Sequence, residues 1–123
     1  MPATTHHLHR LTAADIDRLL DLDRLCLGKF WSRQGFEDEF QRLPRDRANP
    51  DRPSSVFLGA RIPSVSDELI GFAGLWAVGA EAHIITLAVH PDCRRQGVGR
   101  ALVEALLQEA IAQRLEWATL EVR

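Results

Sequence analysis

The stretch from Cys93 to Leu102 reads CRRQGVGRAL and places two arginines before two nearly adjacent glycines and the start of an amphipathic helix. Glycine lets the backbone come close to a ligand, and the first turn of a helix carries unpaired N–H donors with a partial positive charge. Arginines at that end oppose this charge unless an anion lies between them. The stretch therefore predicts an anion site, and phosphate is an anion that helix starts bind readily.

The composition is that of a globular domain. The chain has 123 residues, 46% of them apolar and 26% charged, and we expect a single domain over residues 1–123. A formal net charge of -2 gives no general attraction to nucleic acid. No apolar run approaches membrane-spanning length, and the first residues lack the apolar core of a signal peptide. We expect a cytoplasmic protein with no membrane partner and no direct nucleic-acid partner.

Cysteine and histidine spacing gives no metal signal. Cys26 and Cys93 stand far apart without a CxxC partner, so reduced thiols are expected. In a strand over 6–11, alternation would place His7 and His9 on one face and His6 on the other. We therefore predict no metal site.

Periodicity and turn residues predict a mixture of helices and strands. Thr12 and Ser32 have the character of helix N-caps, and the proline-punctuated segment 44–53 is expected to be a surface loop. Short polar turns between the middle strands favour antiparallel pairing, whereas the final strand–helix–strand unit predicts a right-handed parallel crossover. The expected fold is α+β, a mixed and mainly antiparallel sheet with helices packed on it. Strands are expected over 6–11, 54–62, 69–78, 83–89 and 117–123, and helices over 12–26, 32–43 and 98–115.

Three kinds of phosphate site compete for the glycine stretch. A P-loop is excluded, because the GxxxxGK pattern is absent. A dinucleotide fingerprint would need glycine where Leu102 stands, although Glu121 lies at a fitting distance for its acidic residue. The third is a pyrophosphate cradle with arginines on both sides of the glycines. An ordinary helix start with solvated arginines remains the alternative to all three.

Residues 87–107, LAVHPDCRRQGVGRALVEALL, resemble the acetyl-coenzyme-A-binding motif of the GNAT superfamily of N-acetyltransferases. Arg94, Gly97 and Gly99 occupy its fixed positions. With FWS at 30–32 and LEVR at 120–123, the chain is most similar to the RimI branch, the ribosomal-protein-alanine N-acetyltransferases. The resemblance implies a GNAT-like fold, acetyl-coenzyme A as cosubstrate and no metal. It also implies transfer to an amine, such as the N-terminal α-amino group of a protein, possible examples being small-subunit ribosomal proteins.

The resemblance also assigns residues to the acetyl donor. The loop and the first turn of the helix would hold the pyrophosphate, and the end of the preceding strand would run beside the pantetheine arm and present a backbone donor to the thioester oxygen. The implied pyrophosphate residues are Arg94, Arg95, Gln96, Gly97, Val98, Gly99 and Arg100, and the implied strand residues are Leu87, Ala88 and Val89.

For the acceptor amine, the resemblance points to carboxylates and aromatic residues. Glu121 matches the position of the catalytic base, which must take a proton from an ammonium group. Glu81 is a second carboxylate near the acceptor. Trp31 and Phe36 belong to the segment KFWSRQGF, which shapes the acceptor site in the family, and both also fit an ordinary core.

The chain departs from the family pattern after LEVR. RimI-like members continue with an asparagine-bearing turn, a helix that carries a tyrosine, and further strands, whereas this chain has no tyrosine. We expect the C-terminal strands and last helix of the family fold to be missing, together with the general acid, so that the chain binds acetyl-coenzyme A weakly and acetylates poorly. Two alternatives follow: an acyl-coenzyme-A-binding module, and a homodimer or complex in which another chain completes the open sheet edge.

Overall fold

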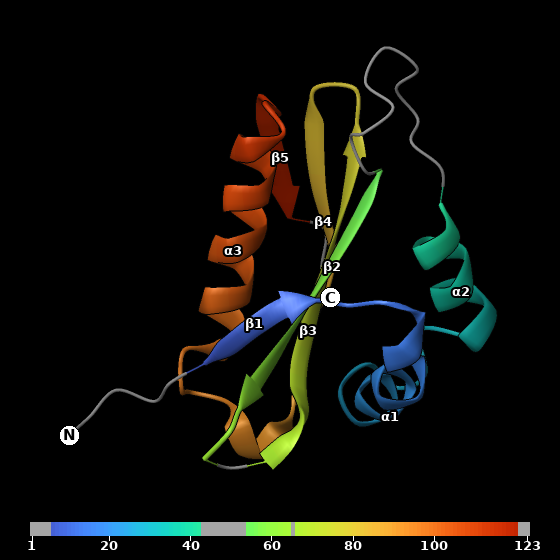
Figure 1. The fold of residues 1–123 in the computed structure, drawn as a ribbon, viewed down its shortest axis with the longest axis vertical. Helices are drawn as coiled ribbons and strands as arrows, with labels where there is room; N and C mark the ends of the chain where they lie inside the picture. The colour runs from blue at the N-terminus through green and yellow to red at the C-terminus, as the bar shows by residue number, and fades with distance from the viewer. Residues whose placement is uncertain (1–5, 43–53, 65, 121–123) are drawn as a thin grey trace.

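The computed structural model describes residues 6–42, 54–64 and 66–120 (Figure 1). Five strands form one sheet in the order β1-β2-β3-β4-β5; neighbours are antiparallel except β5, which runs parallel to β4. This order confirms the predicted mixed, mainly antiparallel sheet and the parallel crossover. The strands are β1 (His7–Arg10), β2 (Ser55–Ile62), β3 (Ser66–Val78), β4 (Glu81–Val89) and β5 (Trp117–Leu120), and the α-helices are α1 (Ile16–Leu27), α2 (Arg33–Gln41) and α3 (Val98–Ala112).

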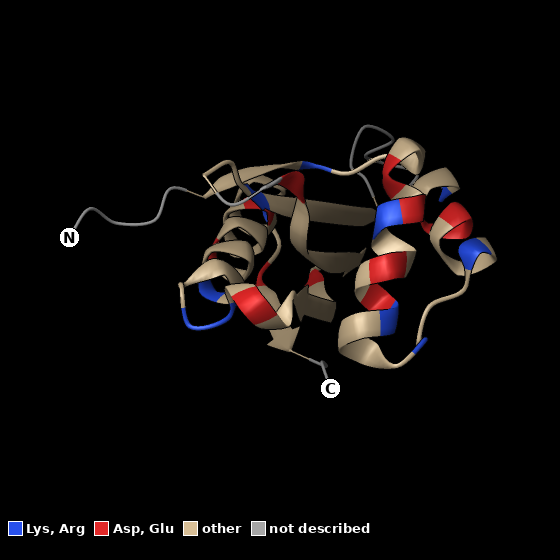
Figure 2. Cartoon of the chain, turned by 90° about the horizontal axis from the view of Figure 1, so that it is seen from below, with Lys and Arg blue, Asp and Glu red and all other residues tan. Residues whose placement is uncertain are grey.

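Helices cover both faces of the sheet. Figures 1 and 2 show α3 on one face and α1 with α2 on the other. Apolar side chains of β2, β3 and β4 therefore form two cores, one against each helical layer. The α3 core contains Leu102 and Leu106, and the α1/α2 core contains Phe36 and Phe72; all four are fully buried.

Polar caps start two helical segments where the sequence predicts them. Thr12 Oγ1 accepts a hydrogen bond from the Ala14 amide, and the Asp15 carboxylate accepts one from the Thr12 amide. This capping box opens a 3-10 turn that runs into α1. Ser32 Oγ accepts from the Gly35 amide and caps α2.

The third helix is shorter than predicted. The sequence pattern predicts a helix over 98–115, whereas α3 ends at Ala112. Arg114 has a φ of 59°, and this left-handed conformation ends the helix. The Leu115 amide then donates to the Ala110 carbonyl oxygen and closes the turn that leads to β5.

A β-bulge divides β4 into two halves. Gly74 pairs with Thr86 and Leu75 pairs with Ile84, so Ile85 is an extra residue in β4. Ala82 and Ile84 pack toward α3 before the bulge. The bulge places two successive side chains on the α1/α2 face: Ile85 packs against the α1/α2 core, and Thr86 accepts a hydrogen bond from Trp31.

The last strand of the sheet accompanies only the first half of β4. Residues 81–84 pair with 117–120, whereas residues 85–89 of β4 have no β5 partner within the part of the chain that the structure describes. All four residues of β5 are exposed. The predicted continuation of this strand, residues 121–123, lies outside the described residues. In the described part, no helix has the length and apolar character needed to cross a bilayer.

The α1/α2 core generates a stability prediction. Phe36 is fully buried and makes aromatic contacts with Trp31, Phe57 and Phe72. The substitution Phe36→Ala should lower the free energy of unfolding by about 3–5 kcal/mol, because it leaves a cavity in this core. Urea unfolding followed by circular dichroism measures the change. Ile111→Ala, at a helical position that is 66% exposed, is the control and should cost less than about 1 kcal/mol. Equal losses in the two variants would contradict the core assignment.

Candidate functional site

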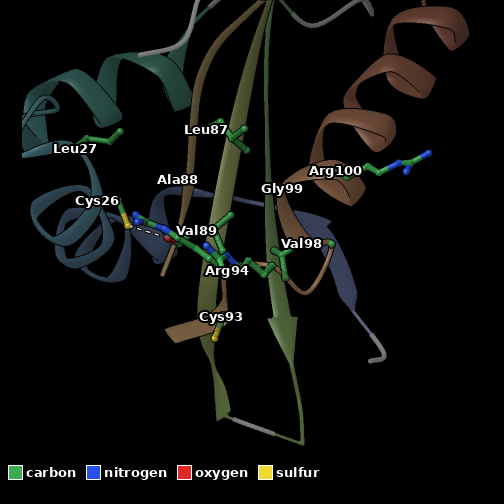
Figure 3. Close-up of a pocket in the computed structure, with 12 residues that line it drawn as sticks. Cys26, Leu27, Leu87, Ala88, Val89, Cys93, Arg94, Val98, Gly99 and Arg100 are labelled. Carbon is green, nitrogen blue, oxygen red and sulfur yellow. Dashed lines mark hydrogen bonds between the residues drawn. The ribbon is translucent and has the colours of Figure 1, made fainter. Parts of the chain in front are cut away.

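A cavity lies where the end of β4, the C-terminus of α1 and the start of α3 meet (Figure 3). Its volume is about 410 Å³, which is within the range of small-ligand sites. Nine of the residues predicted from the sequence contribute to its lining, together with Cys26, Leu27 and Cys93. The predicted residues in the lining are Leu87, Ala88, Val89, Arg94, Arg95, Gly97, Val98, Gly99 and Arg100.

The loop between β4 and α3 presents unpaired backbone donors. Arg95 and Gly97 have φ values of 64° and 79°, a turn of the backbone that groups successive N–H donors. The first helical hydrogen bond runs from the Ala101 amide to the Gly97 carbonyl oxygen, and no side chain caps the helix. Within the described residues, the amides of 96–100 donate to no backbone or side-chain acceptor. This arrangement suits an anion.

The arginines around this loop take different positions. The Arg94 side chain points toward α1 (Figure 3), and its Nε donates to the Val89 carbonyl oxygen at 3.1 Å. Arg95 is exposed and lines the cavity. Arg100 points away from the cavity in Figure 3, and its Nε donates to Glu104 at 2.8 Å. In this conformation Arg94 is therefore the arginine whose side chain is held against the cavity wall, and Arg100 would have to turn to reach a ligand.

Gly99 keeps a passage open between α3 and β4. A Cβ atom on Gly99 would lie 3.7 Å from Val89 Cγ2 and 4.0 Å from Leu87 Cδ2, so any larger side chain would grow into the space between them. An extended ligand anchored at the loop can run along Val89 and Leu87 toward the bulge. Gln96, the remaining predicted residue, is partly buried in the loop.

The end of α1 contributes residues that the sequence analysis does not predict. Cys26 Sγ donates to the Val89 carbonyl oxygen at 3.3 Å, the same oxygen that accepts from Arg94. Burial raises the pKa of the Cys26 thiol, and a hydrogen bond from Arg94 opposes that rise. His6 lies on another side of the loop, with Cε1 3.7 Å from the position of a Cβ on Gly97. No local motif predicts these contacts, since they join segments far apart in the sequence.

The two predicted aromatic residues form a packed layer on the α1/α2 face. Trp31 stacks on Phe36 with ring centroids 4.9 Å apart. The Trp31 amide donates to the buried carboxylate of Asp23 at 3.0 Å, and Trp31 Nε1 donates to Thr86 Oγ1 at 3.2 Å. Phe36 is fully buried beneath it. Phe36 therefore supports Trp31, which is only partly buried.

The predicted carboxylates are placed differently. Glu81 is the exposed first residue of β4, and its Oε2 lies 3.0 Å from His83 Nε2. Glu121, the predicted base, lies outside the described residues. Among the residues that the structure describes, no group of three histidine, cysteine or acidic side chains could hold a metal ion.

Comparison with known proteins places this arrangement in a family. The model of the family described as "Acetyltransferase (GNAT) family" matches residues 16–123. A search of curated proteins gave no significant match.

Solved structures with the same fold include three informative examples. The PaiA N-acetyltransferase from Thermoplasma acidophilum, in complex with coenzyme A, superposes with a TM-score of 0.76 at 17% identity over 94% of this chain and 78% of its own. The ribosomal-protein-S18-alanine N-acetyltransferase from Escherichia coli superposes with a TM-score of 0.74 at 22% identity, and the match covers 94% of this chain and 66% of that protein. An aminoglycoside acetyltransferase from an uncultured soil metagenomic sample, in complex with sisomicin, superposes with a TM-score of 0.62 at 19% identity. That match covers 96% of this chain and 78% of the aminoglycoside acetyltransferase. Proteins with this fold thus include acetyltransferases whose acceptors differ in chemistry, namely a protein alanine and an aminoglycoside.

Gly99 gives a direct test of the passage. The substitution Gly99→Val should raise the dissociation constant for coenzyme A at least about tenfold, because its methyl groups would fill the space beside Leu87 and Val89. Stability should not fall, since valine is a better helix former than glycine. Isothermal titration calorimetry measures the affinity. Ala112→Val adds the same side chain at the exposed far end of α3 and should bind coenzyme A like the parent. An unchanged affinity in Gly99→Val would argue against this route for the ligand.

Cys26 gives a second test. A raised pKa leaves less thiolate near neutral pH, so iodoacetamide should alkylate Cys26 more slowly than a free thiol, and the rate should recover as the pH rises. Saturating coenzyme A should slow the reaction further, because Cys26 lines the cavity. A Cys93→Ala background leaves Cys26 as the one thiol of the chain, and mass spectrometry follows the modification. Equal rates with and without coenzyme A would contradict the position of the ligand.

Proposed function

The chain belongs to the GNAT acetyltransferase family, and on that premise we propose that the amine it acetylates is the N-terminal α-amino group of a protein. The acetyl donor of the family is acetyl-coenzyme A, and the chain is an acetyl-coenzyme-A-dependent acetyltransferase of GNAT type. The proposal concerns the acceptor and the residues that serve each substrate.

For the donor, we assign the diphosphate to the loop and the first turn of α3. The amides of 96–100 supply donors, and Arg94 and Arg95 supply positive charge at the same place. The open passage at Gly99 supports this assignment, because it leads from the loop along the wall of β4. Acetyl-coenzyme A bound there would bring its thioester toward the bulge.

The backbone of β4 supports a donor to the thioester oxygen. The His90 amide donates to Ile70 on β3, so the peptide groups of the alternate residues Val89 and Leu87 point to the opposite edge. The Val89 carbonyl oxygen already accepts hydrogen bonds there from Cys26 and Arg94. The Leu87 amide is thus the donor that we propose for the thioester oxygen, a role for which a fixed N–H group is well suited.

Charge along the described parts of β4 and β5 supports a singly charged amine as acceptor. In the described residues, β4 and β5 together carry one carboxylate, Glu81. A polycationic acceptor such as an aminoglycoside would gain from several carboxylates, whereas a peptide N-terminus presents one ammonium group and an otherwise neutral backbone. This single carboxylate is the observation that carries the proposal.

The resemblance to the RimI branch narrows the proposal further. We propose a ribosomal protein as the acceptor, a cytoplasmic location, and Trp31 at the border of the acceptor site. The solved N-acetyltransferases of Escherichia coli and Brucella melitensis that act on ribosomal-protein alanine share the fold. The resemblance alone implies Glu121 as the base, and the structure suggests a different group for this role, which is described in the next subsection.

The proposal is tested by offering acetyl-coenzyme A and a panel of amines to the protein. Peptides with free N-termini that begin with alanine, serine or methionine should release coenzyme A thiol and gain one acetyl group at the N-terminus, as seen by tandem mass spectrometry. The same peptides with a formylated N-terminus and an internal lysine are the matched control and should remain unmodified.

Two small acceptors complete the panel. Spermidine and sisomicin present several ammonium groups and should react at least about tenfold more slowly than the best peptide, measured as kcat/KM. Acetylation of these polyamines with no reaction of any free peptide would overturn the proposed acceptor class and would leave the family assignment intact.

A further inference from the structure

A hydroxyl, an imidazole and a carboxylate form a continuous hydrogen-bonded chain across β4 and β5. Thr119 Oγ1 lies 2.9 Å from His83 Nδ1, and His83 Nε2 lies 3.0 Å from Glu81 Oε2. His83 and Thr119 are register partners in the parallel pair, and Glu81 is two residues before His83 on the same face. The strand register therefore holds the three side chains in line.

This chain of side chains lies on the α1/α2 face of the sheet, near the last β4–β5 pair among the described residues. Trp76, the register partner of His83 on β3, donates through Nε1 to Glu39 of α2, which places the pair on the α1/α2 face. Among the described residues, the last β4–β5 pair is Ile84 with Leu120. His83 is one residue before Ile84 and two residues before the bulge at Ile85, and the proposed donor passage runs along Val89 and Leu87 toward that bulge.

The three groups have complementary protonation roles. A carboxylate accepts hydrogen bonds only, so Glu81 selects the tautomer of neutral His83 that carries its proton on Nε2. The Nδ1 lone pair then faces Thr119, whose hydroxyl donates to it. A hydroxyl in this state keeps a lone pair free to accept a proton from a cation in front of it.

We propose that Thr119, His83 and Glu81 are a proton relay that deprotonates the acceptor ammonium group; the inference rests on the proposed acetyl transfer. One ammonium proton passes to Thr119 Oγ1 as the Thr119 hydroxyl proton passes to His83 Nδ1, and the resulting imidazolium is stabilised by the Glu81 carboxylate. The neutral amine then attacks the thioester carbon, so that a C–N bond forms and the C–S bond breaks. A second amine proton goes to the departing thiolate, and the imidazolium releases its proton to water.

The surroundings of the relay suit this role. The side chains of His83 and Glu81 are 22% and 53% exposed, and Thr119 is exposed, so an amine can reach the hydroxyl and a proton can leave to solvent. Among the described residues, Glu81 is a charged group that bonds to His83, and Trp76 from β3 and Thr119 from β5 are neutral register partners of His83.

The relay is tested with His83→Gln, Thr119→Val and Thr119→Ser, using the best acceptor of the amine panel. His83→Gln should lower kcat by about 10²-fold or more, while the KM for acetyl-coenzyme A and the binding of coenzyme A stay unchanged. Thr119→Val should lower kcat in the same way, and Thr119→Ser should restore most of it. The dependence of kcat on pH should differ between His83→Gln and the parent protein, because the variant lacks the imidazole that accepts the proton. His7→Gln, at an exposed position of β1, is the control and should behave like the parent.

A measurement independent of turnover decides the geometry. Nitrogen-15 NMR of the imidazole rings should show the Nε2–H tautomer for His83 in the parent protein and a change at Nδ1 in Thr119→Val. A resting Nδ1–H tautomer would overturn the relay. Full activity in His83→Gln together with loss in Glu121→Gln would also overturn it, while leaving the proposed acetyl transfer in place. A panel without any reactive amine would instead count against the proposed function, and the tautomer would then decide the relay alone.

Discussion

The extra residue in β4 is the constraint on which the site depends. With strict alternation, Leu87 and Val89 could not share the α3 face with Ala82 and Ile84, because the step from Ile84 to Leu87 is three positions and an odd step changes the face. The bulge at Ile85 changes the face. The bulge thus divides β4 by role in our proposal: the second half lines the cavity that we assign to the acetyl donor, and the first half carries His83 and Glu81, which we assign to the acceptor.

One carbonyl oxygen joins the donor site to the rest of the fold. The oxygen of Val89 accepts from Cys26 at the end of α1 and from Arg94 in the loop before α3. The end of α1 and the loop before α3 thus meet at a single peptide group, beyond the part of β4 that pairs with β5 in the described residues. The position of α1 in turn depends on the core of Phe36 and Trp31, so the aromatic layer supports both the cavity and the α1/α2 face of the sheet.

Local signals in the sequence predict the elements and the donor loop, and they miss what depends on register. The caps at Thr12 and Ser32, the succession of helices and strands along the chain, and the glycines before α3 are all encoded by residues close in sequence. The role of Cys26 is not, since α1 reaches β4 only through tertiary packing. The bulge at Ile85 leaves no trace in HIITLAV, which reads as an uninterrupted strand. Phe36 fits an acceptor site and a core equally well in the sequence, and its complete burial is visible only in the structure.

The hydrogen bond from Arg94 to Val89 also bears on the cost of ligand ordering. A free arginine side chain has about 2 kcal/mol of rotamer entropy to lose when it is immobilised. The Arg94 side chain is already held by a backbone oxygen in the ligand-free fold, so part of that entropy is lost during folding, before any diphosphate arrives. Among the described residues, the Arg95 side chain has no such hydrogen-bond partner. We therefore expect a diphosphate to order Arg94 at a smaller entropic cost than Arg95, while both arginines supply positive charge that attracts the ligand.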